Sequence, residues 1–200
     1  VDARQANQLH RLPPRTTLAS GEALGSINLL DAIDASPEDL ADFDGCFDSL
    51  CAGSVDLQDG FYQFGDPAWG SWMCFDVEVT AGELGITTIY DDVARRRVPV
   101  AEDELIWPCF AALPMGWSWA LWMCHEVLVD AMDAVGLPGD TWVLDKARTP
   151  HLHGGSVARA PYVDNGNMVS LSADALNARL LSLTEELDRR GRRWHALEMP

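Results

Sequence analysis

Two long stretches of this chain place hydrophobic residues at helical spacing. Residues 117–135 are mostly apolar, and the Gly-Leu-Pro that follows them predicts a helix end. In residues 173–190 four leucines fall on one stripe of a helix surface. They are Leu176, Leu180, Leu183 and Leu187. The glycine at 191 is typical of the residue just past a helix. The pattern therefore predicts two helices that pack on a core.

Shorter apolar or alternating stretches predict strands. The predicted strands cover 50–57, 72–80, 105–113, 157–163, 168–171 and 193–198. Two of them are joined through Asp164-Asn165-Gly166, and Asn-Gly is a strong hairpin signal. Residues 36–44 and 90–97 predict further helices, and 58–64 predict a short helix or turn. Strands mixed with helices, with one clear hairpin, indicate an α+β fold.

The composition fits one globular domain. The chain has 200 residues, of which 48 % are hydrophobic and 22 % charged. No run of about 18 apolar residues occurs, so we expect no membrane span. The N-terminus has no secretory signal and begins with Val, which indicates a processed or fragmentary sequence. Five cysteines without a Cys-x-x-Cys pair predict reduced, mostly buried thiols in an intracellular protein of the nucleus or cytoplasm.

The net charge of −17 argues against nucleic-acid binding, which normally depends on Lys and Arg. The charge is uneven along the chain, however. Residues 31–50 hold seven carboxylates and no base, whereas arginines cluster at 95–97 and 189–193. Composition alone therefore disfavours a nucleic-acid enzyme, and only specific motifs can outweigh it.

Three short segments carry residues suited to chemistry. They are Asp56-Leu57-Gln58-Asp59-Gly60-Phe61, Leu113-Pro114-Met115-Gly116 and Tyr162-Val163-Asp164-Asn165. Taken singly, each has an ordinary explanation, since an Asp after a strand is often a cap and Asp-Asn-Gly is often a turn. Two-metal phosphoryl transfer needs carboxylates that converge on cations about 3.5–4 Å apart. A strand end and a hairpin tip are good places from which to aim Asp56 and Asp164 at one point.

In this order the three segments resemble motifs A, B and C of the reverse transcriptase palm. The resemblance implies a fingers–palm fragment of retroelement (retrotransposon) type, with an antiparallel palm sheet and packing helices. Partial fingers would cover about 1–45 and 66–110, and the palm about 46–65 and 111–200. Residues 1–7 are similar to a fingers segment and 173–198 to motif D. The family's triphosphate-binding Lys and Arg would precede Val1, and its thumb would follow Pro200.

The resemblance also implies roles for single residues. Asp56 and Asp164 would bind metal together with the Leu57 carbonyl, and Asn165 would join them in catalysis. The implied nucleotide-binding residues are Leu57, Asp59, Gly60, Phe61, Pro114, Met115, Gly116 and Tyr162. Phe61 would be the steric gate that favours deoxynucleotides; simple core packing is its ordinary alternative. Two positions depart from the family: Met115 stands where retroviral members often have Gln, and Asn165 replaces a second Asp.

The implied activity is RNA-directed DNA polymerase, a nucleotidyltransferase that uses Mg²⁺ or Mn²⁺ as cofactor. Its partners would be a primer–template nucleic acid, deoxynucleoside triphosphates and other domains of a longer polyprotein, with no membrane. One alternative is an inactive or repurposed palm that serves as an acidic binding module, which the charge and Asn165 motivate. A metal-dependent phosphohydrolase that uses the same carboxylates is a second alternative.

Overall fold

The structure of the protein is a computed structural model. It describes residues 3–27, 50–65, 74–91, 93–137, 139–152 and 155–199. The helix predicted at 36–44 lies outside these residues. The chain divides into two compact units, residues 1–63 with 115–200, and residues 64–114. Among the described helices, none has both the length and the apolar character needed to cross a bilayer.

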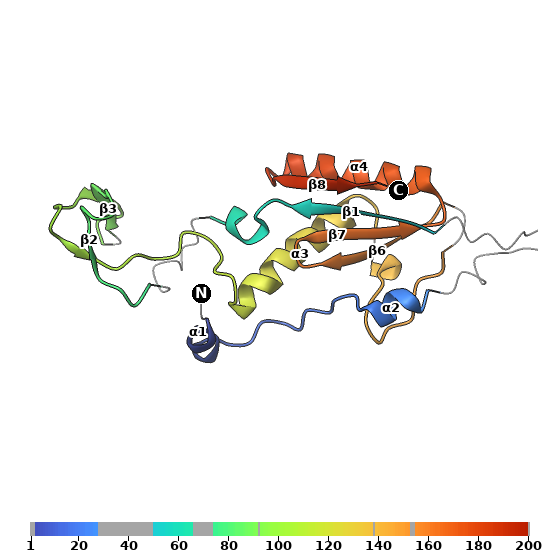
Figure 1. The fold of residues 1–200 in the computed structure, drawn as a ribbon, viewed down its shortest axis with the longest axis horizontal. Coiled ribbons are helices and arrows are strands. Elements are labelled where there is room, and N and C mark those ends of the chain that lie inside the picture. The colour runs from blue at the N-terminus through green and yellow to red at the C-terminus, as the bar shows by residue number, and fades with distance from the viewer. Residues whose placement is uncertain are drawn as a thin grey trace, which may run out of the picture. The chain divides into compact units, whose positions relative to one another are not determined.

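The first unit is built on a four-stranded antiparallel sheet. Its strands are β1 (Cys51–Leu57), β6 (Val157–Tyr162), β7 (Asn165–Ser170) and β8 (Trp194–Glu198). Their order across the sheet is β6-β7-β1-β8 (Figure 1). The first strand of the chain therefore lies between strands from its C-terminal quarter. The sheet and its packing helices confirm the α+β class, and the strands predicted near 50–57, 157–163 and 193–198 are confirmed.

Two helices cover one face of this sheet, α3 (Ser118–Ala134) and α4 (Ala173–Arg189). The four predicted leucines of α4 are all fully buried, and they pack with Val55, Leu57 and Met168 of the sheet. Ser172 begins α4 by accepting a hydrogen bond at its hydroxyl from the Ala175 amide, 3.2 Å away. Gly191 follows the helix with φ 66°. Both long helices predicted from the sequence are confirmed.

Among the described residues, those that cover the opposite face of the sheet lie over only part of it. The short helix α2 (Gly21–Gly25) and the loop around the 3₁₀ turn η4 (Gly139–Thr141) contribute to a second apolar cluster there. Its buried members are Ala23, Val143, Leu152, Ala158, Ala160 and Val169. This cluster covers the β6–β7 side of the sheet, away from the end of β1 at Asp56.

The predicted hairpin is present, but its turn lies earlier than the sequence indicated. β6 and β7 pair from Val157↔Ser170 to Tyr162↔Asn165, so Val163 and Asp164 form the two-residue turn. Val163 has φ 57°, a conformation that a β-branched residue rarely adopts. Asn165 and Gly166 belong to β7 instead. Gly166 is buried opposite Val55, where a Cβ would lie 3.1 Å from both Leu183 and Met132, so packing accounts for this glycine.

The start of α3 is capped by a residue from near the N-terminus of the chain. Asn7, on the short helix α1 (Arg4–Leu9), accepts hydrogen bonds at Oδ1 from the Ser118 amide (2.9 Å) and hydroxyl (3.1 Å). Its Nδ2 donates to the Gly116 carbonyl at 3.0 Å. The residue at the cap position, Trp117, makes no capping bond with its own side chain. Asn7 therefore supplies the cap that the local sequence lacks.

A charged and a titratable side chain are buried between β6 and α3. Arg159 is 1 % exposed; it pairs with Asp133 at 2.7 Å and lies over the Trp142 ring, 4.6 Å from its centroid. His125 is also 1 % exposed, and neither ring nitrogen has a hydrogen-bond partner within the described residues. Burial, with the charge of Arg159, lowers the pKa of His125 from 6.5 to about 4. His125 is therefore neutral at physiological pH.

The second unit contains two short strand pairs. β2 (Val79–Thr80) pairs with β5 (Leu105–Ile106), and β3 (Thr88–Asp91) pairs with β4 (Arg96–Pro99). The helix predicted at 90–97 is wrong, because this stretch is a hairpin. The strands predicted at 72–80 and 105–113 are much shorter within the described residues.

Local hydrogen bonds explain the hairpin in the second unit. The Asp91 carboxylate accepts from the Val93 amide at 2.8 Å and the Ala94 amide at 2.9 Å. Such bonds from an aspartate to the following amides favour a turn over a helix. Arg95 then takes φ 54°, which reverses the chain into β4.

Candidate functional site

The fold brings Asp56 and Asp164 together. Asp56 is the next-to-last residue of β1 and lies opposite Asn165 in the ladder with β7, and Asp164 is the residue before Asn165. The Leu57 amide donates a hydrogen bond to the Asp164 carbonyl at 3.1 Å. Both aspartates line one hollow of about 190 Å³. Two acids that are far apart in the sequence are therefore neighbours at one end of the sheet.

Most of the other predicted residues of the first motif line the same hollow. The full set is Asp56, Leu57, Asp59, Gly60, Phe61, Tyr62, Met115, Asp164 and His195. Val55 and Leu57 are buried toward the helices, whereas Asp56 between them keeps 30 % of its side-chain surface exposed. The alternation of β1 thus places the carboxylate on the face opposite the helices.

Gly60 makes room for Asp164. It begins the 3₁₀ turn η2 (Gly60–Gln63), which is separated from the end of β1 by two residues, as the sequence predicted for 58–64. A Cβ on Gly60 would lie 2.8 Å from the Cβ of Asp164 and 3.2 Å from its Oδ2. The hairpin tip and η2 therefore approach too closely for any side chain at position 60.

His195 belongs to the site and was missed by the sequence analysis. Its Nε2 lies 3.2 Å from Asp56 Oδ2. In the β1–β8 ladder Asp56 pairs with Ala196 and Leu57 pairs with Trp194, so His195 is the extra residue of a β-bulge. Bulges redirect side chains and are common beside active sites. A regular alternation gives no sign of such a bulge, which is why the sequence did not reveal it.

The hollow is electrostatically negative. Burial raises the pKa of Asp56; His195 offsets part of this rise, while the charges of Asp164 and Glu198 add to it. Cys124 lies under the hairpin tip, where burial and the charge of Asp164 raise its pKa to about 12. Mutual repulsion of the acids favours a cation between them.

Gln63 holds β8 against η2. Its Nε2 donates to the carbonyls of Gln58 and Arg193, each at 2.6 Å. Its Oε1 accepts from the Arg193 amide, also at 2.6 Å. One side chain thus fixes the entry of β8 two residues before His195, a role that the sequence analysis did not assign.

Four predicted site residues do not line the hollow. Asn165 donates from Nδ2 to Asp164 Oδ1 at 3.3 Å, so it contacts the site through that aspartate. Tyr162 is 50 % exposed at the end of β6. Gly116 has φ 94°, and its carbonyl is held by Asn7. Pro114 belongs to the second unit, whereas Met115 lines the hollow.

The arginines at 189–193 are largely engaged within the protein. Arg189 pairs with Glu186, and Arg190 pairs with Glu186 and Asp130. Arg192 donates to the Gln63 carbonyl at 3.0 Å. The cluster therefore offers less positive charge to a ligand than the sequence indicated.

The donor atoms of the hollow partly fit a divalent cation. Magnesium takes oxygen ligands, usually one or two carboxylates completed by water and substrate phosphates. Asp56 and Asp164 supply the two carboxylates. In the portion of the chain that is described, no group of three or more His, Cys, Asp or Glu is arranged to hold a metal ion. A cation here would need ligands from water or a substrate.

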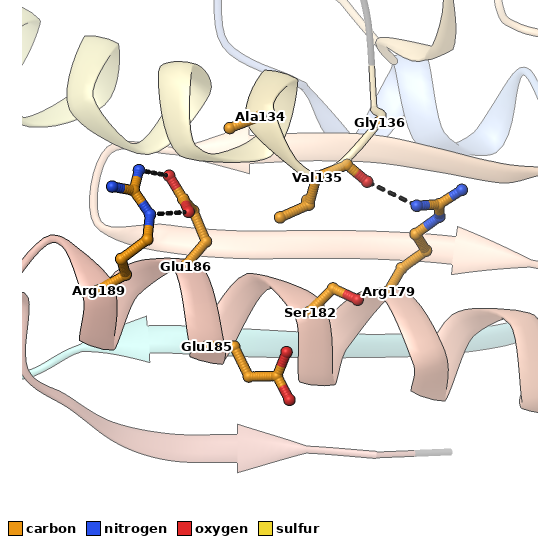
Figure 2. A pocket seen from close by; sticks show the side chains of 8 residues that line it. All are labelled: Ala134, Val135, Gly136, Arg179, Ser182, Glu185, Glu186 and Arg189. Atoms are coloured by element: carbon orange, nitrogen blue, oxygen red, sulfur yellow. Dashed lines mark hydrogen bonds and ion pairs between the residues drawn. The ribbon is translucent and has the colours of Figure 1, made fainter.

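A larger hollow of about 500 Å³ lies between the end of α3 and α4 (Figure 2). Three of its charged groups are engaged within the protein: Arg189 donates twice to Glu186, and Arg179 donates to the Val135 carbonyl at 2.6 Å. Figure 2 shows Glu185 directed away from these pairs. The Arg189–Glu186 pair lies within α4, and the bond from Arg179 joins α4 to the end of α3. We therefore assign this hollow to helix packing and not to ligand binding.

Comparison with known protein families and with curated proteins finds no match to this chain.

Proposed function

We propose that the first unit is a reverse transcriptase-type palm that uses Asp56 and Asp164 for metal-dependent nucleotidyl transfer. One observation carries this proposal: the β1–β7 register sets a strand-end aspartate beside a hairpin-tip aspartate, and both line one hollow. The sheet order β6-β7-β1-β8 with two helices on one face is compatible with a palm. The sequence motifs support the choice of family, and the two neighbouring aspartates support metal-dependent chemistry.

Under this proposal the chain's residues bind and orient the reacting groups. Asp56 and Asp164 hold Mg²⁺ or Mn²⁺, with the Leu57 carbonyl as a further ligand. A bound divalent cation would stabilise the charge that develops at phosphorus during attack by a primer 3′-hydroxyl. Because Gly60 has no side chain, Asp164 has room to keep its position. Phe61 lines the hollow, where it would exclude a ribose 2′-hydroxyl.

Primer extension tests the proposal. The chain is incubated with a primed RNA or DNA template, deoxynucleoside triphosphates, and Mg²⁺ or Mn²⁺. Asp56→Asn and Asp164→Asn should each reduce extension at least about a hundredfold, because they remove a ligand whose contribution is several kcal/mol. Glu185→Gln, an exposed carboxylate on α4, is the matched control and should leave extension unchanged. Extension that survives both aspartate changes would refute the site.

An acidic binding module is the second candidate function. The amide of Asn165 in place of a carboxylate and the engaged arginines favour it. Absence of both primer extension and magnesium-dependent nucleotide binding by the wild-type chain would favour this candidate over the polymerase. Nucleotide hydrolysis without a primer would instead identify a phosphohydrolase.

A further inference from the structure

The second unit contains two exposed cysteines in direct contact, a pair that the proposed function does not use. Cys74 and Cys109 face each other in an antiparallel β-bridge, with their Sγ atoms 3.1 Å apart. Neither sulfur is in a disulfide, and both residues are exposed. This corrects the expectation of mostly buried thiols, since of the described cysteines only Cys124 is buried.

The backbone at this pair suits a cross-strand bond. The Phe75 amide donates to the Pro108 carbonyl at 2.8 Å, so Cys74 and Cys109 occupy a position between the ladder hydrogen bonds. At such positions opposite Cα atoms are about 4.5 Å apart and the side chains are closest. Disulfides span Cα separations of about 4.4–6.8 Å. Closing the bond needs the sulfurs to approach by only about 1 Å.

The pair is also held in place by its neighbours. The rings of Phe75 and Phe110, each next to one of the cysteines, pack with centroids 4.7 Å apart. The Cys109 thiol contacts the Trp107 carbonyl at 3.5 Å. These contacts bring the two segments together without a covalent bond, so the thiols are positioned before any oxidation.

We propose that Cys74 and Cys109 are a dithiol modification site that closes to a disulfide on reaction with a small disulfide oxidant. This proposal is independent of the aspartate site, because both cysteines belong to the unit 64–114.

The reaction proceeds by two thiol–disulfide exchanges. Burial and the contact with Cys74 raise the pKa of Cys109 to about 11. Either sulfur can attack first and gives the same disulfide; with Cys74 first, the two steps follow in this order. The Cys74 sulfur displaces one thiol from the oxidant and forms a mixed disulfide. The Cys109 sulfur then attacks Cys74 and displaces the second thiol. Two electrons and two protons pass from the cysteines to the oxidant, which leaves as two thiols.

The test uses the full chain, reduced and then treated with oxidised glutathione. Intact-mass measurement should show the loss of two hydrogens without a glutathione adduct, and thiol counting should show two of the five cysteines lost. Peptide mapping should find Cys74 linked to Cys109. A bond between other cysteines, or five unreacted thiols, would overturn the proposal.

Single variants separate proximity from simple exposure. In Cys74→Ser or Cys109→Ser the remaining cysteine cannot close the bond, so a stable glutathione adduct should accumulate. Cys51→Ser removes a cysteine of β1 and should leave the Cys74–Cys109 bond unchanged. A wild-type chain that retains glutathione as persistently as the single variants would refute the pairing. Circular dichroism of each variant confirms that it is folded.

Discussion

The Asp56 carboxylate lies 3.2 Å from the His195 imidazole (Oδ2–Nε2), and a β-bulge in β8 makes this contact possible. Without the extra residue, position 195 would follow the regular alternation of β8. The contact ties the first acid of the candidate site to a strand from the opposite end of the chain. His195 therefore influences the charge state of Asp56 from the neighbouring strand.

Replacing His195 should change the titration of Asp56. Because His195 lowers the pKa of Asp56, His195→Ala should raise that pKa above its wild-type value. Carboxyl-carbon NMR titration of Asp56 measures the change directly. His151→Ala, at an exposed histidine outside the hollow, is the control and should leave the titration unaltered. An identical Asp56 titration in both variants would show that the contact has no electrostatic effect.

Adding one methyl group at Gly60 should disturb both stability and the site. The new Cβ would lie 2.8 Å from that of Asp164, so the hairpin tip or η2 must shift. We expect Gly60→Ala to lose about 1–3 kcal/mol of unfolding free energy, as is usual for overpacking. Urea unfolding measures this loss, and Mn²⁺ titration should show weaker binding if the aspartates form the cation site. Gly21→Ala, with no atom within 4 Å of its new Cβ, should be tolerated.

The stability of the chain should fall as His125 is forced to accept a proton. Its pKa is lowered from 6.5 to about 4, mainly by burial and further by Arg159. Between these values the unfolded state binds more protons than the folded state, so the free energy of unfolding decreases as the pH drops. The decrease should reach about 3 kcal/mol near pH 4. Urea unfolding at several pH values measures it.

The matched variant for this pH effect is His125→Phe, which keeps a buried ring without a titratable group. Its unfolding free energy should depend less on pH than that of the wild type over the same interval. Carboxylates contribute to acid unfolding of both proteins, so the difference between the two curves isolates the histidine. Parallel curves would contradict the burial of a neutral His125.

Loss of the Asn7 side chain should weaken the start of α3. Asn7→Ala removes the acceptor for the Ser118 amide, and we expect a loss of about 1 kcal/mol, typical of a helix cap. Asn7→Asp keeps the acceptor but loses the bond to the Gly116 carbonyl, so its loss should be smaller. Gln8→Ala, at an exposed position of α1, is the control. Hydrogen exchange at Ser118 reports whether the helix start has opened.

The first unit was more predictable from the sequence than the second, and the reason is the size of their elements. Helices α3 and α4 repeat their apolar spacing over several turns, β6 is an almost continuous buried run, and β1 alternates buried with more exposed positions. In the second unit the strands have two to four residues, which is too short for a period to distinguish a hairpin from a helix. In that unit the hydrogen bonds that the Asp91 carboxylate accepts favour a hairpin over a helix.

Site residues that belong to a short local motif could be predicted from the sequence. Those that reach the site through the backbone of a strand far along the chain could not. Asp56, Gly60 and Asp164 were identified from local motifs. His195 depends on a bulge, and Gln63 depends on a strand that arrives from far along the chain. Arg159 was likewise expected on an ordinary strand, and its burial depends on a partner from α3. Such contacts leave no periodic mark in the sequence.

The pairing of Asp56 with Asn165 has a consequence for how the protein matures. Side chains alternate along a strand, so a slip of one residue between β1 and β7 would turn Asp56 toward the leucines of α4 and expose Val55 to water. A shifted β1 would therefore lose the burial of Val55 in the core and the position of Asp56 beside Asp164 together. Molecules should therefore either be folded with the two aspartates side by side or be unfolded. Few should be folded without the pair of aspartates.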